Sequence, residues 1–190
     1  MWSPDGSHIA FSSNRDGRTG VYQKATGRAG LEEVLDGEAQ YPSDWSRDGR
    51  YIVEVRENPK TKTDIWGLPL LGDRKPFAFL DDVFWEGFAK LSPNGRWLAY
   101  PSNPTKRFEI YVQPFPAPGG QRWQVSTNGG DFPTWSRDGK KLFFVDGNRT
   151  MMASDVKTDG VNFRSARRSP SLRRVWSNHR GSTSAMTAAF

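Results

Sequence analysis

The sequence predicts an all-β fold, a β-propeller of about four four-stranded blades. A motif with a Ser-x-Asp/Asn-Gly core recurs four times, at 2–6, 45–49, 91–95 and 135–139, so its period is 43, 46 and 44 residues. Alternating apolar residues follow each motif, and no segment has helical periodicity. A period of about 40–45 residues is typical of a four-stranded propeller blade.

Each motif is expected to form a hairpin turn. Asp or Asn can hydrogen-bond nearby backbone, and Gly adopts a left-handed conformation that other residues resist. Equivalent positions in different blades lie far apart, so these carboxylates should serve the turns and not one shared site. The predicted turn residues are Asp5, Gly6, Asp48, Gly49, Asn94, Gly95, Asp138 and Gly139.

Period-two alternation after each motif indicates strands with one buried face. In the second strand of each blade, the residues three and five positions after the motif glycine are expected to share one face. These pairs are Ile9 and Phe11, Ile52 and Glu54, Leu98 and Tyr100, and Leu142 and Phe144. The third strand is expected at Val21-Tyr22, Ile65-Trp66, Ile110-Tyr111 and Met151-Met152, and the outer strand near Leu35, Leu80 and Val125. Inner strands are expected before the motifs, at 86–91 and 132–135.

The repeat is incomplete at both ends. The first motif begins at Trp2, so the first blade is expected to lack its innermost strand, which leaves about 15 strands in all. The pattern fades from Arg164 onward, and 171–176 are predicted to form the outer strand of the last blade. Blades are therefore assigned to 1–176, and the Ser/Thr/Ala-rich segment 177–190 to a disordered tail.

Composition excludes several classes of site and partner. The chain has no cysteine, which rules out disulfides and thiolate chemistry. No apolar run approaches the roughly 20 residues of a membrane helix, and no signal peptide is expected from the first residues, so no membrane insertion is predicted. Six arginines after residue 160 account for the whole net charge of +6. Because the blades are otherwise neutral, no nucleic-acid partner is expected.

No catalytic, cofactor or metal site is predicted. The sequence has no G-x-S-x-G nucleophile elbow, and His8 holds an ordinary strand position. The segment 155–160 resembles the start of a calcium loop, but its twelfth position is Ala166, where a bidentate carboxylate is required.

Two features are weighed as possible binding sites. Glu54 stands where the other blades have Phe or Tyr, and it is either a polar handle in a ligand-facing cavity or the partner of a nearby arginine. The basic segment either binds an acidic partner or is a solvated chain end; its candidate residues are Arg167, Arg168, Arg173 and Arg174. Leu91, in place of the blade tryptophan, and a short loop before Met151 are further departures from the repeat.

Six stretches carry a resemblance to a known repeat: WSPDGSHIAFSSNRDG, DWSRDGRYIV, DIWGLPLLGDRKPF, LSPNGRWLAYPSN, EIYVQPFPAPGG and WSRDGKKLFF. Over residues 1 to about 160 the chain resembles the TolB-type, WD-like propeller repeat of bacteria. The sequences of these stretches are most similar to those of the C-terminal propeller of bacterial serine/threonine protein kinases.

The resemblance implies an extracytoplasmic sensing or binding module, with a protein or peptide partner and no cofactor. The alternative is an accessory propeller of a larger enzyme, inactive alone: the sensor region of a kinase or the gate of a serine peptidase. No Gly-rich phosphate loop, HRD or DFG motif of a kinase is present.

An open arc of blades exposes the faces of its terminal blades. These faces are expected to carry large apolar residues, Phe11 and Tyr22 at one end and Phe144 and Met152 at the other, which normally mark an interface. A longer native chain is the first explanation, self-association of two chains the second, and closure as a four-bladed ring the third.

Overall fold

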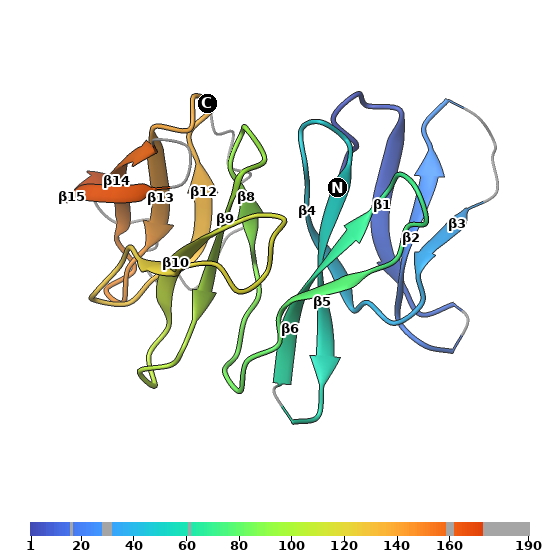
Figure 1. Cartoon of the computed structure of the whole chain (residues 1–190), viewed down its shortest axis with the longest axis horizontal. Helices are drawn as coiled ribbons and strands as arrows, with labels where there is room; N and C mark the ends of the chain where they lie inside the picture. The colour runs from blue at the N-terminus through green and yellow to red at the C-terminus, as the bar shows by residue number, and fades with distance from the viewer. Residues whose placement is uncertain (16, 28–31, 61, 159–161, 173–190) are drawn as a thin grey trace, which may run out of the picture.

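The chain folds entirely into strands and turns (Figure 1). The computed structural model describes residues 1–15, 17–27, 32–60, 62–158 and 162–172, with side chains up to residue 165. These residues contain fifteen strands in four antiparallel sheets and no helix. The predicted all-β propeller class is confirmed.

Each sheet is one blade, built from strands consecutive in the sequence. Blade 1 contains β1 (His8–Ser13), β2 (Gly20–Ala25) and β3 (Glu33–Asp36). Blade 2 contains β4 (Tyr41–Trp45), β5 (Tyr51–Asn58), β6 (Lys62–Pro69) and β7 (Phe77–Leu80). Blade 3 contains β8 (Lys90–Leu91), β9 (Trp97–Ser102), β10 (Glu109–Pro114) and β11 (Trp123–Gln124). Blade 4 contains β12 (Asp131–Trp135), β13 (Lys141–Val145), β14 (Met151–Thr158) and β15 (Phe163–Leu172).

The two ends of the repeat differ in how they complete a sheet. Blade 1 has three strands, and Trp2 forms an isolated bridge to Ile9 where an inner strand would run. In blade 4 the outer strand β15 spans Phe163–Leu172, so it begins earlier than the predicted 171–176 and shares only residues 171–172 with it; 173–176 lie outside the described residues. An outer strand needs no apolar alternation and tolerates proline. The arginines and Pro170 of β15 interrupt the alternating pattern, so the start of this strand could not be recognised in the sequence. Residues 177–190 lie outside the described residues.

The four motifs form the same turn. In each, the Ser hydroxyl donates to the Asp or Asn side chain at 2.6–2.7 Å, and the Gly N–H donates to the Ser carbonyl at 2.8–2.9 Å. The glycine φ angles lie between 70° and 74°. Hydrogen bonds from Ser3 and Ser136 hold the pKa values of Asp5 and Asp138 below their usual range. The ionised carboxylate is therefore part of the turn.

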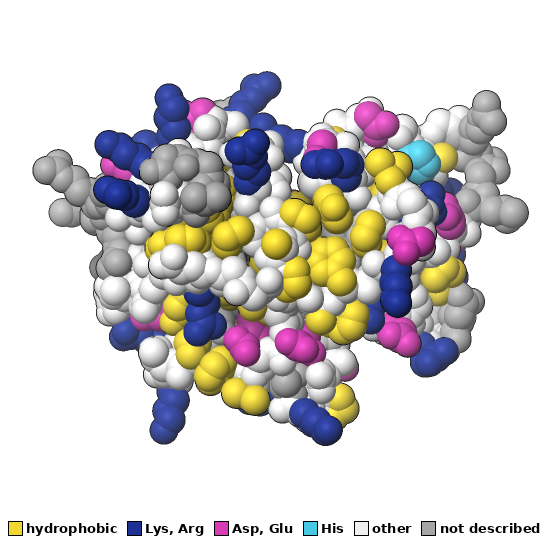
Figure 2. Space-filling view, in the orientation of Figure 1, with side chains coloured by type: hydrophobic (Ala, Val, Ile, Leu, Met, Phe, Trp, Pro, Cys, Tyr) yellow, Lys and Arg dark blue, Asp and Glu magenta, His cyan; other side chains and the backbone are white. Residues whose placement is uncertain are grey.

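Every blade from the second onward packs one face on its predecessor. Residues three and five past the motif glycine point to the preceding blade, and the residues between them point to the next. The cluster with the most buried residues lies between blades 2 and 3. On the surface, Figure 2 shows hydrophobic side chains gathered across the middle of the face in view. Phe144 and Met152 pack in the cluster between blades 3 and 4, so the prediction that they form an open terminal face is wrong.

Candidate binding surface on the inner strands

The first strands of blades 2, 3 and 4 lie next to one another. β4 contacts β8, and β8 contacts β12, so these strands form the inner wall of the arc (Figure 1). A cavity of about 380 Å³ opens between them, lined by Tyr41, Pro42, Ser43, Phe88, Lys90, Phe132, Pro133 and Thr134. The wall is therefore lined by one segment from each of three blades.

Three aromatic rings line this wall, and two more continue from them through ring contacts. The ring centroids of Tyr41 and Phe88 lie 6.3 Å apart, and those of Phe88 and Phe132 lie 5.2 Å apart. Trp85 packs on Phe88 at 5.8 Å and on Phe108 at 4.9 Å. We call these five residues the inner aromatic surface. Distances of 4.5–7 Å are those of interacting rings, so they form one continuous apolar surface.

Part of the inner aromatic surface is exposed to solvent. Phe88, Phe108 and Phe132 are 39%, 36% and 57% exposed, and they are three of the seven large hydrophobic residues exposed in the described part of the chain. Scattered apolar side chains need no explanation, but a contiguous exposed patch commonly marks an interaction site.

The backbone at two of these rings is strained. Phe88 and Phe132 have φ angles of 45° and 53°, a region that bulky residues rarely occupy. Both stand three residues before the first residue of the turn motif in their blades, and Pro42 holds that position in blade 2. In β4 and β12 the register shifts beside it. Strain of about 1–3 kcal/mol per residue persists where the surrounding structure enforces it, and it gathers at functional sites.

The charges beside the surface are engaged by the protein. Lys90 Nζ donates to the Ser43 carbonyl at 2.6 Å and lies 3.5 Å from Asp44. Asp44 also accepts a hydrogen bond from the Leu91 N–H at 2.8 Å, and burial raises its pKa. Asp131 accepts from the Phe132 N–H at 2.8 Å. A ligand would therefore meet aromatic faces more than free charge.

A larger cavity lies among the motif turns. It occupies about 880 Å³ between blades 3 and 4 and is lined by Pro93, Trp135, Lys140 and neighbouring residues. A smaller cavity of about 400 Å³ has the equivalent position between blades 1 and 2. Because the space recurs with the repeat, we attribute it to the way adjacent blades diverge at their turns. Trp97 and Trp135 line it, and both rings pack on Phe163. Trp97 is only 2% exposed, so these rings belong to the core between blades 3 and 4, whereas three rings of the inner wall are exposed.

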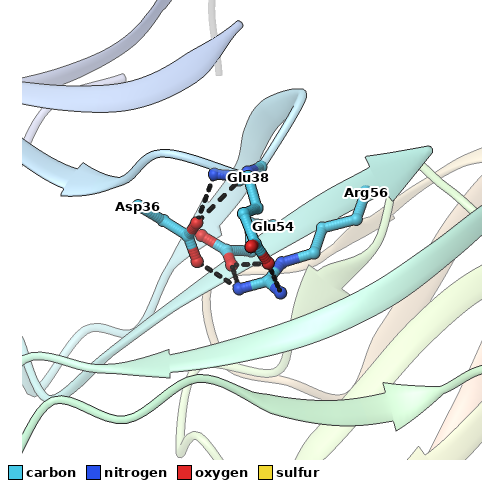
Figure 3. A network of polar contacts seen from close by, with 5 residues as sticks. Asp36, Glu38, Glu54 and Arg56 are labelled. Carbon is cyan, nitrogen blue, oxygen red and sulfur yellow. Dashed lines mark hydrogen bonds and ion pairs between the residues drawn. The ribbon is translucent and has the colours of Figure 1, made fainter. Parts of the chain in front are cut away.

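Glu54 lies in a closed network between blades 1 and 2 (Figure 3). Its side chain is fully buried, and Arg56 donates to it from two nitrogens at 3.3 Å each. Arg56 also pairs with Asp36 of blade 1 and with Glu38 at 3.2 Å, and it stacks 3.9 Å from the ring centroid of Trp66. Of the two interpretations of Glu54, the structure favours pairing with an arginine.

Burial, followed by the neighbouring Asp36, raises the pKa of Glu54 to about 9. The pKa of Asp36 is lowered: burial opposes this, but hydrogen bonds from Glu54 and from the Glu38 backbone outweigh it. The pair therefore holds one proton at neutral pH, on Glu54. This arrangement ties two blades together.

The other predicted candidates are not gathered into a site. The turn residues lie at four separate turns, and the His8 ring contacts Ser7 Oγ at 2.8 Å. Arg167 and Arg168 belong to β15, where only the backbone is described, and Arg173 and Arg174 lie outside the described residues. Among described residues, no group of three or more His, Cys, Asp or Glu is arranged to hold a metal ion. None of the described segments forms a helix suited to crossing a membrane.

The inner aromatic surface was not predicted from the sequence. A usable signal was present, because Phe88 and Phe132 hold the same repeat position in two blades. The signal is weak, because both residues precede the turn and lie in irregular backbone, outside the alternating strand pattern.

The sequence matches no protein-family model and no curated protein. Solved structures do match. The putative TolB from Agrobacterium tumefaciens has a TM-score of 0.70 at 20% identity, over 88% of this chain and 63% of that one. TolB from Acinetobacter baumannii has a TM-score of 0.68 at 20% identity, over 86% and 41%. A puromycin-hydrolysing peptidase of Mycobacterium tuberculosis has a TM-score of 0.61 at 14% identity, over 87% and 30%.

These matches concern the fold. The chain spans less than two thirds of the length of each of these structures. The order of the blades, the repeated turns and the TolB matches agree, and the chain therefore has the fold of a TolB-type β-propeller.

Proposed function

We propose that this protein is a non-catalytic binding module that holds a protein or peptide against the inner aromatic surface. The observation that carries the proposal is the continuous run of partly exposed rings from Tyr41 through Phe88 to Phe132, contributed by three blades. Aromatic side chains supply large contact area at low entropic cost, and they dominate the energetics of many protein interfaces.

Backbone strain at Phe88 and Phe132 supports the same function. The strained conformation projects two large apolar side chains toward solvent, which does not stabilise the fold by itself. A binding partner that buries these rings would supply a reason for the arrangement. Extracytoplasmic sensing, as in the propellers of bacterial kinases, and service as an accessory propeller of a larger enzyme are compatible uses of the same surface.

The test is selection of peptides from a random library on the purified protein, followed by affinity measurement with synthetic fluorescent peptides. The double variant Phe88→Asn/Phe132→Asn removes two rings, and asparagine tolerates the left-handed backbone. We expect it to weaken binding at least about tenfold. Leu71→Ser, at a residue that is 67% exposed after β6, is the matched control and should leave affinity unchanged.

Peptides that bind the double variant as well as the unaltered protein would contradict the proposal. The non-catalytic part is tested separately, by assaying the protein for peptidase and kinase turnover, and none is expected.

A further inference from the structure

The motif turns of blades 2, 3 and 4 carry more positive than negative charge. Residues 45–50, 91–96 and 135–140 contain five basic side chains and two acidic ones. The basic residues, all exposed, are Arg47, Arg50, Arg96, Arg137 and Lys140. The motif turns lie along the upper edge of the arc in Figure 1, and Figure 2 shows Lys and Arg side chains spread along the same edge. We call the edge formed by these three turns the motif rim.

The two acidic side chains of the motif rim are used by their own turns. Asp48 accepts a hydrogen bond from Ser46 Oγ at 2.7 Å and pairs with Arg50 Nε at 2.6 Å. Asp138 accepts from the Lys140 N–H at 3.0 Å. Within the described part of the chain, Arg50 is the only one of the five basic residues that forms an ion pair with a carboxylate. The other four charges are therefore available to a partner.

The turn of blade 3 shows how one of these charges is left uncompensated. Arg96 directly follows the motif glycine, as Arg50 does in blade 2, but Asn94 stands where blade 2 has Asp48. Asn94 makes the same turn hydrogen bonds, from Ser92 Oγ at 2.7 Å and from the Arg96 N–H at 3.1 Å. The asparagine thus preserves the turn and removes the carboxylate that would neutralise Arg96.

The three turns are close enough to act together. Nη1 of Arg47 in blade 2 donates to the backbone carbonyl of Arg137 in blade 4 at 3.4 Å, across 90 positions of the sequence. The turn of blade 3 lies against that of blade 4, since a Cβ atom on Gly139 would lie 3.5 Å from Pro93 Cδ. Like charges in one region repel each other, and a bound anion would relieve that repulsion.

The cavity of about 880 Å³ lies between the turns of blades 3 and 4 and adjoins these charges. Trp97 and Trp135 contribute the apolar part of its lining, and Lys140 and Lys157 contribute cations. The carboxylates in the lining are engaged within blade 4, one by its turn and one by an ion pair of 2.6 Å. The cavity therefore suits an apolar side chain flanked by negative charge.

We propose that the motif rim binds an acidic segment of a partner protein, with carboxylates on Arg47, Arg96 and Arg137 and an apolar side chain in the cavity. The planar guanidinium group of arginine binds a carboxylate through two parallel hydrogen bonds. A nucleic acid would need a continuous run of phosphate contacts, whereas Asp48 and Asp138 interrupt the basic residues of the rim. The proposal concerns a second surface and is independent of the inner aromatic surface.

The experiment measures the binding of fluorescent probes to the full chain by fluorescence anisotropy, at low and at physiological salt. The probe is a synthetic peptide of Asp and Glu residues around one central Phe. Comparison probes are the same peptide with Ser in place of Phe, a Lys peptide, a single-stranded DNA oligonucleotide and vesicles that contain phosphatidylglycerol. We expect the acidic peptide to bind most tightly, and to lose affinity when salt is added or the Phe is absent.

Removal of two charges from the motif rim tests the site itself. Arg47→Gln/Arg137→Gln should weaken binding of the acidic peptide about fivefold or more. The matched control, Arg18→Gln/Lys60→Gln, removes two exposed charges from the loops after β1 and β5, on the opposite rim. It should change the affinity by less than about twofold. Thermal unfolding checks that both proteins fold.

A single isosteric change tests the role of the blade 3 turn. Asn94→Asp gives Arg96 the carboxylate partner that Arg50 has in blade 2, and it keeps the hydrogen bonds of the turn. It should therefore fold like the unaltered protein and weaken the affinity for the acidic peptide about twofold or more. Arg96→Gln removes the same charge directly and should have a similar effect.

An acidic peptide that does not bind at low salt, or that binds the rim variants as well as the unaltered protein, would overturn the proposal. So would an oligonucleotide or a vesicle that binds more tightly than the peptide, because the partner would then be a nucleic acid or a membrane. Phe88→Asn/Phe132→Asn should bind the acidic peptide normally. This variant separates a failure at the motif rim from a failure at the inner aromatic surface.

Discussion

The interface between blades 1 and 2 and the interface between blades 2 and 3 solve the same packing problem with different chemistry. At equivalent positions of the repeat, blade 3 buries Tyr100 and blade 2 buries Glu54. Around Tyr100 the neighbours are aliphatic and aromatic, including Val53, Phe79 and Phe115. Around Glu54 they are Asp36, Arg56 and the ring of Trp66. The repeat thus fixes which positions are buried and leaves open what fills them.

The polar network leaves a hydrogen-bonding group without a partner. In the described part of the chain, Trp66 Nε1 is buried in this interface and has no hydrogen-bond partner. Only a small apolar cluster, Ala10, Ile52 and Leu68, accompanies the network. A buried ionic network is weak support for stability, since desolvation can outweigh attraction. We therefore expect blade 1 to be held less firmly than blades 2 and 3 hold each other.

Truncation in the aromatic interface should have the largest effect. Phe79 is 3% exposed, and its ring lies 5.3 Å from that of Phe115. Phe79→Ala removes a buried ring and leaves a cavity, which should lower the free energy of unfolding by about 3–5 kcal/mol. Denaturant unfolding measures it. A loss below about 1 kcal/mol would show that this interface is not the main source of stability.

Removal of the shared cation should come next. Arg56→Met retains the apolar stem over Trp66 but leaves Asp36 as an unpaired buried carboxylate. We expect a loss of about 2–4 kcal/mol, with protease cleavage beginning in blade 1. Limited proteolysis with mass spectrometry locates the first cut. Arg50→Met removes an exposed ion pair to Asp48, and as a control it should change stability by less than about 1 kcal/mol.

The proton on Glu54 should make stability depend on pH. Its pKa is raised to about 9 in the folded protein, so the folded state keeps a proton that the unfolded chain releases near its ordinary value of 4.5. Stability should therefore fall as pH rises from about 4.5 toward about 9. Asp36 adds nothing to this slope, because its lowered pKa places its effect at more acidic pH.

Glu54→Gln keeps a hydrogen-bonding group of similar size without the ionisation. It should flatten this slope and raise the free energy of unfolding above pH 7 by about 1–2 kcal/mol. Unfolding curves at several pH values compare the two proteins. Burial likewise raises the pKa of Glu86, to about 8, so Glu86→Gln should also flatten part of the slope, and it measures the share of a carboxyl group outside the network. Equal slopes in the unaltered protein and Glu54→Gln would mean that Glu54 does not hold the proton.

The turns should show the smallest effects. Asp48→Ala removes hydrogen bonds from Ser46 Oγ at 2.7 Å and the Arg50 N–H at 3.1 Å, and should cost about 1 kcal/mol. Asn94→Asp converts the blade 3 turn to the type in the other blades and should be near neutral. Thermal unfolding resolves both. A large loss in Asp48→Ala would give this turn a role in contacts between blades.

The regular part of the molecule could be predicted from residues because it is local. The spacing of the motifs predicted the number of blades. The alternation of apolar residues after each motif glycine predicted which positions are buried, such as Leu98 and Leu142. The last outer strand could not be placed, because an edge strand carries no required pattern. The blade against which Phe144 packs could not be predicted either. Alternation identifies the residues that share a face of a strand, but it does not identify the blade that covers that face.

The sequence by itself determined the all-β class, the number of blades and the residues of the turns, because turn chemistry and period-two alternation act between close neighbours in the chain. Only the tertiary structure decided that Glu54 is closed in by Asp36 and Arg56, and that Tyr41, Phe88 and Phe132 form one surface. Those contacts join residues of different blades. Their existence depends on the angle and distance at which blades pack, and no local pattern encodes these.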